Sequence, residues 1–261
     1  MSILRRLYRV TAIFFWTLFM ILRALPHQFG GWEGRRKIAD LLRTWSRGVA
    51  GILNLRVEVR GKIPDDFSGL VVSNHLGYID IITHGTVFPL RFTSTTVVAR
   101  WPIFGSMIAV TQPVLVNRES RPASRKALRD FAKTMRKGMC LIVYPEGTST
   151  DGKGGILPFK STSFEAATFG DMPILPVLTR YIEEPGKPTV CWYGDMTLLP
   201  HMWQVLGLSS VEAELHILPP VYPEGMSRKE VSSRVHGLME KEYSRVTGRD
   251  AQELTPADLP F

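Results

Sequence analysis

The chain of 261 residues is poor in cysteine: it has only Cys140 and Cys191, each within an apolar run. Such positions favour two buried, reduced thiols over a disulfide or a metal site. The sequence has no Gly-x-Ser-x-Gly motif, which argues against a hydrolase whose serine sits on a strand-to-helix turn. It also has no internal repeat and no low-complexity tract, and its length favours one larger domain with an appendage.

Acidic residues are scarce near the N-terminus. Residues 1–62 have 3 Asp and Glu against 12 Lys and Arg, whereas the rest of the chain has 21 against 20. The net charge of +8 therefore belongs to this first segment. A basic segment is typical of contact with an anionic surface, either nucleic acid or membrane. Aromatic and aliphatic residues dominate the segment, which disfavours nucleic acid.

The first segment contains an apolar run over residues 10–22, which follows Arg5, Arg6 and Arg9. Thirteen helical residues reach about 20 Å, short of the roughly 30 Å hydrocarbon core. This length favours a helix embedded in one leaflet, or a span that also uses its flanks, over a comfortable crossing, and Pro26 is expected to end the helix. A cleaved signal peptide is the alternative, but the sequence before Pro26 offers no small-x-small cleavage site.

A second helix is expected over residues 38–53. Its apolar residues recur at helical spacing, with three arginines on the other side: Ile38, Leu41, Leu42, Trp45, Val49, Ile52 and Leu53 against Arg36, Arg43 and Arg47. This pattern is typical of an interfacial helix on a membrane. A helix packed on the core with a solvated charged side has the same pattern.

From Leu55 onward short apolar runs alternate with helical stretches. Strands are expected at 55–60, 69–73, 93–98, 113–117, 140–144, 174–179, 189–193 and 213–218. Helices are expected near 78–88, 122–137, 161–169 and 228–246. The alternation predicts an α/β fold, a mixed β-sheet covered by helices. Residues 1–54 would form a helical membrane-docking segment and residues 55–261 the α/β domain. The basic helix at 122–137 is expected to cover the sheet, with a membrane-facing or phosphate-binding role as the alternative.

A histidine and an aspartate, His75 and Asp80, follow the apolar run Leu70–Val72. An imidazole held by a carboxylate takes a proton from a hydroxyl near pH 7. A strand-like run that ends in a polar turn marks the edge where α/β folds place their sites. Five residues on one ideal helix lie about 140° apart. We therefore expect His75 in the turn before a helix and Asp80 in its first turn, pointing back.

Three further segments carry polar groups suited to binding. Glu146, Gly147 and Thr148 offer an acceptor, close backbone approach and donors, although a tight turn with a solvated glutamate has the same sequence. Arg118 at a strand end can bind a phosphate or carboxylate with two parallel hydrogen bonds. Lys160 opens a predicted helix, where the helix dipole prefers an anion, and this conflict suggests an anionic partner. For both cations a plain surface position is the alternative.

Together these segments resemble the glycerolipid acyltransferase family, whose best-known members are bacterial 1-acylglycerol-3-phosphate acyltransferases. The resemblance covers about residues 50–222 and consists of four blocks in the family's order. The blocks are matched by Asn74, His75 and Asp80, by the run ending at Arg118, by Tyr144–Ser149, and by Ile174–Val177.

The resemblance implies a membrane-bound O-acyltransferase. It would move a fatty acyl chain from acyl-CoA or acyl-ACP to the free hydroxyl of a lysolipid, without a permanent cofactor or a metal. His75 would be the general base and Asp80 its orienting partner. The implied substrate-binding residues are Asn74, Arg118, Glu146, Gly147, Thr148 and Lys160. The implied partners are membrane lipids, the lysolipid and the acyl carrier, with no nucleic acid. The cytosolic supply of acyl thioesters places the protein at the cytoplasmic face of the inner or plasma membrane.

One residue departs from the family pattern: Ser149 stands where the third block usually has an arginine, which is thought to help bind the acceptor phosphate. This departure weighs against plain lysophosphatidic acid. The segments 146–152 and 192–196 look like branches that acylate lyso-ornithine lipids or lysophospholipids with larger head groups. The alternatives are a phospholipid-dependent transacylase, acylation of glycerol-3-phosphate, and a non-catalytic lipid-binding protein. A metal hydrolase is disfavoured because His75 and Asp80 lack further ligands at metal spacing.

Overall fold

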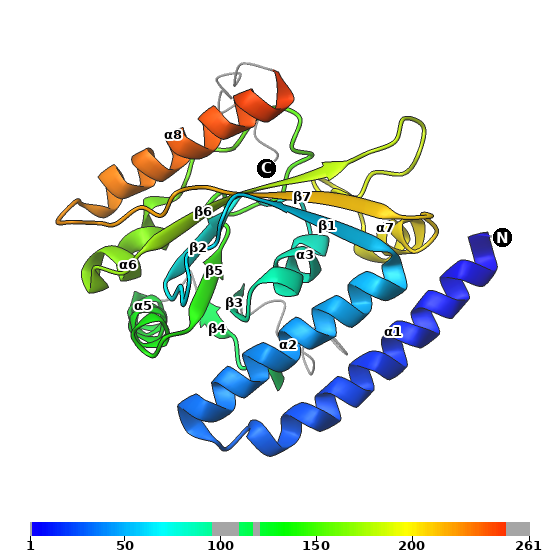
Figure 1. Cartoon of the computed structure of the whole chain (residues 1–261), viewed down its shortest axis with the longest axis horizontal. Coiled ribbons are helices and arrows are strands. Elements are labelled where there is room, and N and C mark those ends of the chain that lie inside the picture. Colours follow the sequence, from blue (N-terminus) through cyan, green and yellow to red (C-terminus); the bar gives the residue numbers. More distant parts are fainter. Residues whose placement is uncertain (1, 96–109, 117–120, 249–261) are drawn as a thin grey trace.

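The computed structural model describes residues 2–95, 110–116 and 121–248. Its centre is a seven-stranded sheet of order β1-β7-β6-β2-β5-β3-β4 (Figure 1). The strands are β1 (Leu55–Arg60), β2 (Leu70–Ser73), β3 (Leu90–Thr95), β4 (Val114–Val116), β5 (Cys140–Val143), β6 (Ile174–Ile182) and β7 (Val211–Ile217). The strands from β6 to β4 are parallel, whereas β6 pairs with β7 antiparallel and β1 runs parallel to β7. The predicted mixed sheet is confirmed.

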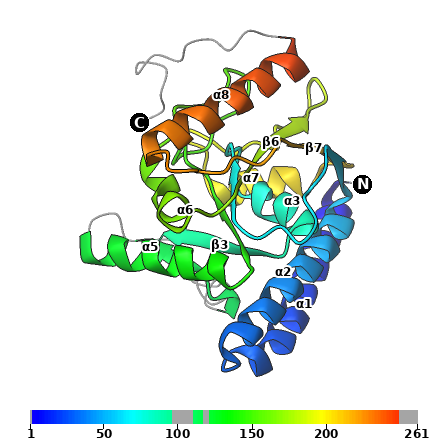
Figure 2. The ribbon, with the colours of Figure 1, turned by 60° about the vertical axis from the view of Figure 1, so that its left-hand side comes forward.

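Helices cover both faces of this sheet (Figures 1 and 2). They are α1 (Ser2–Ala24), η1 (Leu25–His27), α2 (Gly31–Leu53), α3 (Ile79–Val87), α5 (Arg121–Arg136), η3 (Ser161–Phe164), α6 (Glu165–Gly170), α7 (Leu198–Val205) and α8 (Arg228–Thr247). Side chains on β2 alternate between two apolar clusters, as the pleat requires. Leu70 and Val72 pack with residues of α5, α6 and α8, whereas Val71 belongs to the cluster on the other face.

The parallel pairing of β2 with its two neighbours positions the polar turns. Val72 is in register with Val143 of β5 and with Pro176 of β6. The chain therefore leaves β2 and β5 at the same edge of the sheet, and the turns that begin at Asn74 and Tyr144 lie side by side.

The helices α1 and α2 run side by side as a hairpin (Figure 2). The indole Nε1 of Trp16 donates to the carbonyl of Trp45 at 3.0 Å, and the indole of Trp45 donates to Thr17 Oγ1 at 2.9 Å. A Cβ added to Gly48 would lie 2.2 Å from the Trp16 ring, so only glycine permits this approach. α2 also packs on α3 and buries Val49, so part of its apolar side faces the protein.

Arg9 ties α1 to the rest of the protein, although its sequence context suggested a membrane flank. Its side chain is 4% exposed. The guanidinium donates to the carbonyls of Ile52 and Leu53 at the end of α2, at 3.0 and 2.7 Å. It also donates to Leu206 and Leu208 after α7, at 3.1 and 2.6 Å. Since the last carbonyls of a helix have no partner within it, Arg9 satisfies groups that would otherwise need water.

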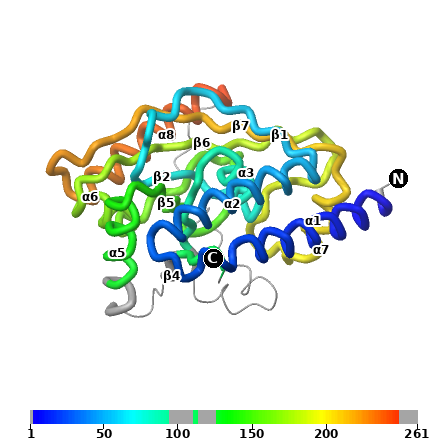
Figure 3. Tube along the Cα trace, turned by 60° about the horizontal axis from the view of Figure 1, so that its bottom comes forward, coloured from blue at the N-terminus to red at the C-terminus, as the bar shows by residue number. Residues whose placement is uncertain are grey.

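The outer side of α1 is apolar and solvent-exposed. Its large exposed hydrophobic side chains are Ile3, Leu4, Leu7, Tyr8, Val10, Phe14, Phe15, Leu18, Phe19 and Leu22. The segment Ile3–His27 is long and apolar enough to cross a membrane by length and composition, a test that a signal sequence also passes. α7 lies beside the first half of α1 (Figure 3), where Arg6 is 5.3 Å from the ring of Trp203. We call the exposed side of α1 the outer stripe.

One predicted strand is not formed, and one helix of the structure was not predicted. Residues 189–193 are not a strand: the side chain of Glu183 binds the amide of Val190 at 3.0 Å, and Trp192 donates its amide to Leu76 at 2.8 Å. α7 was not predicted at all. The expected strand at 93–98 belongs to β3, which begins earlier, and its last three positions lie outside the described residues. The helix end near Pro26 is confirmed, since α1 stops at Ala24.

Candidate active site

The site begins in the turn between β2 and α3. His75 Nδ1 lies 2.7 Å from Asp80 Oδ2, with His75 one-quarter exposed and Asp80 fully buried. Asp80 occupies the first turn of α3 and points back toward the histidine, as expected from the spacing. A carboxylate only accepts hydrogen bonds, so Nδ1 carries the hydrogen. This tautomer leaves Nε2 as the ring nitrogen that can take a proton.

Asp80 is held on both carboxylate oxygens. Oδ2 also accepts the amides of Leu76 and Gly77, at 2.7 and 3.1 Å, and Oδ1 accepts the hydroxyl of Tyr181 at 2.8 Å. Burial raises the pKa of Asp80, but the hydrogen bond from His75, the nearby histidines and the Leu76 amide outweigh it and lower this pKa overall. The carboxylate is therefore ionised and fixed in direction.

Tyr144 and His84 pack around this pair. The rings of His75 and Tyr144 are stacked, with centroids 4.2 Å apart. His84 is buried, and its Nδ1 lies 2.7 Å from the carbonyl oxygen of Asp80 and 3.2 Å from the Tyr144 hydroxyl. Burial lowers the pKa of His84, which keeps this ring neutral. The pair of His75 and Asp80 is thus surrounded by uncharged rings on this side.

Asn74 faces the protein rather than the open side of the site. Its amide nitrogen donates to the carbonyl of Thr179 at 3.0 Å, and its amide oxygen accepts the backbone N–H of Thr179 at 2.8 Å. Both ends of the side chain are therefore used to clamp the turn onto β6. Ser73 adds a hydroxyl contact to Thr179 Oγ1 at 2.9 Å.

Glu146 is the unusual group of the second turn. It is 4% exposed, and both carboxyl oxygens are buried without a hydrogen-bond partner among the residues that the structure describes. Burial raises its pKa well above 4.5, the His75 amide acts in the opposite direction, and the charge of Asp80 adds a smaller rise. An unpaired buried carboxyl is costly, so a native protein that retains one commonly uses it for function.

Gly147 and Lys160 are in contact. Gly147 has a φ of 77°, which favours glycine, and a Cβ added there would lie 2.3 Å from Lys160 Nζ. The amide of Lys160 donates to the carbonyl of Pro145 at 2.9 Å, which fixes the start of η3 against the turn. The ammonium group of Lys160 therefore lies against the turn after β5. Its positive charge there is compatible with binding an anion. Thr148 is exposed on the same turn.

Ser149 is buried, and its hydroxyl donates to the carbonyl of Trp192 at 2.5 Å. The turn after β5 is further tied to the first turn, because Thr150 donates its amide to the carbonyl of His75 at 3.0 Å. Ser149 thus connects the two turns to the 189–197 loop. Arg118, the other cation suggested by the sequence, lies outside the described residues.

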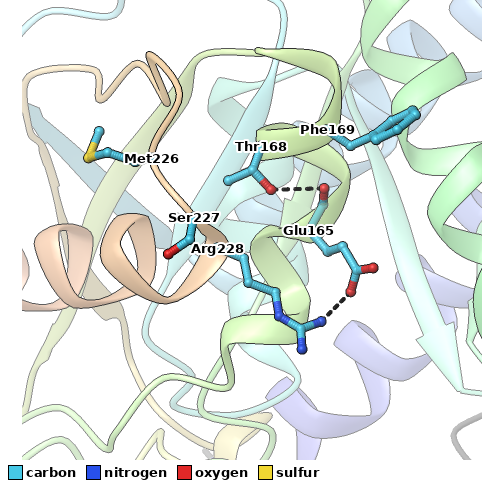
Figure 4. A pocket seen from close by; sticks show the side chains of 6 residues that line it. All are labelled: Glu165, Thr168, Phe169, Met226, Ser227 and Arg228. Atoms are coloured by element: carbon cyan, nitrogen blue, oxygen red, sulfur yellow. Dashed lines mark hydrogen bonds and ion pairs between the residues drawn. The ribbon is translucent and has the colours of Figure 1, made fainter.

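A surface hollow lies elsewhere, between α6 and the start of α8 (Figure 4). It is lined by Glu165, Thr168, Phe169, Met226, Ser227 and Arg228. Glu165 and Arg228 form an ion pair across it. None of these residues belongs to the turns around His75, so we locate the chemistry at the turns.

Known proteins share this arrangement of chain and sheet. The acyltransferase family model matches residues 54–180. A lyso-ornithine lipid O-acyltransferase of Rhodobacter capsulatus is 37% identical over 196 residues, which cover 72% of this chain and 70% of that protein. The chain belongs to the acyltransferase family. A 1-acyl-sn-glycerol-3-phosphate acyltransferase of Neisseria gonorrhoeae is 30% identical over 210 residues, 80% of each chain.

A solved structure shares the fold of this acyltransferase. The 1-acyl-sn-glycerophosphate acyltransferase PlsC of Thermotoga maritima superposes with a TM-score of 0.69 at 24% identity, covering 95% of this chain and 97% of that one. The protein is a lysolipid acyltransferase of the glycerolipid acyltransferase family, and the resemblance seen in its sequence is confirmed.

Three residues of the site were not predicted from the acyltransferase sequence: His84, Thr179 and Tyr181. His84 Nε2 lies 3.0 Å from Thr179 Oγ1, and 95 residues separate the two positions. Tyr181 is 101 positions from Asp80. The signal in the sequence was weak: polar residues at alternating positions of an apolar strand, Thr179 and Tyr181, share one face of β6.

Proposed function

We propose that the protein transfers a fatty acyl chain from an acyl thioester to the free hydroxyl of a lysolipid, with His75 as general base oriented by Asp80. The observation that carries this proposal is the 2.7 Å contact between His75 Nδ1 and an Asp80 carboxylate held on both oxygens. A base held in one tautomer by a fixed, ionised carboxylate suits proton abstraction near neutral pH.

The reaction needs one proton to move twice. His75 Nε2 takes the proton of the acceptor hydroxyl while the oxygen attacks the thioester carbonyl. The tetrahedral intermediate collapses, the C–S bond breaks, and the imidazolium returns the proton to the leaving sulfur. The Asp80 carboxylate stabilises the imidazolium between these steps. No covalent acyl-enzyme forms.

Substrate binding is assigned to the turn after β5. Lys160, in contact with Gly147, supplies positive charge for an anionic group of the acceptor or for the developing oxyanion. Glu146 and Thr148 would contact the acceptor, and Arg118 would bind its phosphate where it has one. Asn74 supports the turn, since its amide is bound to Thr179.

The acceptor is proposed to be a lysolipid that does not depend on the missing third-block arginine. Ser149 turns away from the open side of the site and binds the carbonyl of Trp192. Relatives with both acceptor names, lyso-ornithine lipid and 1-acyl-sn-glycerol-3-phosphate, are similar to this chain. We favour the lyso-ornithine type, because its head group carries no phosphate for the absent arginine to bind.

The protein is proposed to dock on the cytoplasmic face of a membrane through residues 1–54, with residues 55–261 as the catalytic part. The outer stripe of α1 would enter one leaflet, since its apolar side chains face away from the protein. Acyl-CoA or acyl-ACP would approach from the water.

The test uses protein purified in detergent, with labelled acyl-CoA or acyl-ACP and a panel of lysolipids. We expect transfer by the native protein, loss of transfer in His75→Ala with an unchanged thermal midpoint, and full transfer in His236→Gln, a histidine control on α8. Retained transfer in His75→Ala would remove the proposed base. Transfer only from a phospholipid donor would indicate a transacylase, and tight lipid binding without transfer a non-catalytic protein. Arg118→Ala should raise the acceptor KM most for phosphate-bearing acceptors.

A further inference from the structure

One oxygen of Asp80 depends on a single partner outside its own turn. Oδ2 faces His75 and the amides of Leu76 and Gly77, all within five residues of the aspartate. Oδ1 is bound by the hydroxyl of Tyr181, which comes from β6, the strand beside β2. A carboxylate has two oxygens on one plane, so the two sets of contacts together determine how that plane is rotated.

The ring of Tyr181 is itself fixed by packing. It is 9% exposed and belongs to the apolar cluster that includes Leu76 and Ile79 of the catalytic turn. Its hydroxyl also lies 3.0 Å from Thr83 Oγ1, one turn further along α3 than Asp80. The hydroxyl therefore has defined neighbours on both sides, and the ring has little freedom to withdraw it.

We propose that Tyr181 is a positioning residue for acyl transfer: its hydroxyl holds the second oxygen of Asp80 and so fixes the carboxylate against His75. The inference rests on the proposed function through the role given to His75. Tyr181 lies four positions beyond the fourth sequence block, Ile174–Val177, so the blocks that identify the family do not include it.

Removal of the hydroxyl has a predictable electrostatic effect. Tyr181→Phe leaves Oδ1 buried without its donor, and the negative charge of Asp80 is then shared mainly with His75. The imidazolium is then held more strongly by the carboxylate. The carboxylate is also free to rotate, so Nε2 is less well aimed at the acceptor hydroxyl. Partners in the second layer of comparable sites change activity by about 10- to 100-fold.

The experiment compares Tyr181→Phe with the native protein under the transfer assay. We expect kcat to fall about 10-fold or more and the acceptor KM to stay within about twofold. In a plot of kcat against pH, the rise on the acid side should move to higher pH. Tyr243→Phe is the matched control: its hydroxyl is buried and donates to the carbonyl of Lys153 at 2.8 Å. It removes the same group and should leave kcat and the rise on the acid side in place.

A second measurement does not need activity. The His75 ring signals, assigned by their loss in His75→Gln, are followed against pH by nitrogen NMR of histidine-labelled protein. In Tyr181→Phe their titration should move to higher pH relative to the native protein, and in Tyr243→Phe it should not. If the native protein transfers no acyl group, the proposed function fails. The NMR titration still shows whether the Tyr181 hydroxyl acts on His75 through Asp80.

Two results would overturn the inference. The first is an unchanged kcat profile and an unchanged His75 titration in Tyr181→Phe. The second is a loss of kcat that follows a lowered thermal midpoint and appears to the same extent in Tyr243→Phe, because the tyrosine would then serve packing alone.

Discussion

Glu146 should make the protein less stable as the pH rises, and Glu146→Gln should remove this effect. Burial without partners raises the pKa of the carboxyl well above 4.5, its value in an unfolded chain. Between these two pKa values the folded protein binds a proton that the unfolded chain has released. Stability therefore falls as the pH rises through this range.

The size of the effect follows from one proton. The free energy of unfolding falls by at most about 1.4 kcal/mol per pH unit. The fall begins at the pKa that the carboxyl has in the unfolded chain. At pH 7 this slope sets an upper limit of about 3 kcal/mol on the gain of Glu146→Gln over the native protein. For a protein of this size that gain corresponds to roughly 6–12 °C in the thermal midpoint.

The assay is thermal unfolding in detergent at several pH values from about 4 to 8, with transfer measured on the same samples. The difference in midpoint should be near its minimum below pH 4.5 and should grow above it. Glu212→Gln, a half-exposed carboxyl paired with Arg56, is the control and should show no such growth. A difference for Glu146→Gln that is the same at every pH would refute the reasoning. We expect the stabilised variant to transfer poorly, because the carboxyl is held in this state for substrate binding.

The other predictions concern the same two turns and the hairpin. Arg9→Leu should lower stability by at least about 3 kcal/mol in thermal unfolding, since several buried carbonyls lose a charged donor; an unchanged midpoint would contradict this. Gly147→Ala should reduce kcat about 10-fold by displacing the adjacent lysine, whereas Gly155→Ala, which is strained but meets nothing within 4 Å, should reduce it little. Phe14→Ser with Phe15→Ser should weaken vesicle binding about 100-fold in a sedimentation assay, because two exposed aromatic rings are lost from the outer stripe; equal binding would show that the stripe does not enter lipid.

The fold and the contact between His75 and Asp80 could be predicted from the sequence because their signals are local. The apolar run of β2, the polar turn and the first turn of α3 are consecutive, so the spacing of His75 and Asp80 was enough to place them. The partners of that pair were not accessible. Tyr181 reaches Asp80 across 101 positions, and no periodic pattern encodes such a contact.

Other differences have equally physical causes. Residues 189–193 have the composition of a strand, but their amides bind Glu183 and Leu76 instead of a neighbouring strand. Ser149 could be recognised as a departure from the family, whereas its bond to Trp192 required the folded chain. Arg9 counted as a basic flank, because sequence alone does not show that five carbonyls converge on it.

The contacts of Arg9 have a consequence for which lysolipids can react. They join α1 to the chain after α7, and Trp192, on the loop before α7, donates its amide to the turn that contains His75. In the proposed docking, direct contacts within the protein, instead of a tether, set the height of His75 above the bilayer. An acceptor whose hydroxyl lies at a different depth in the leaflet would have to leave its resting position to react. Selection among lysolipids would therefore depend on how deep the acceptor hydroxyl lies in the leaflet, independent of any contact with the head group.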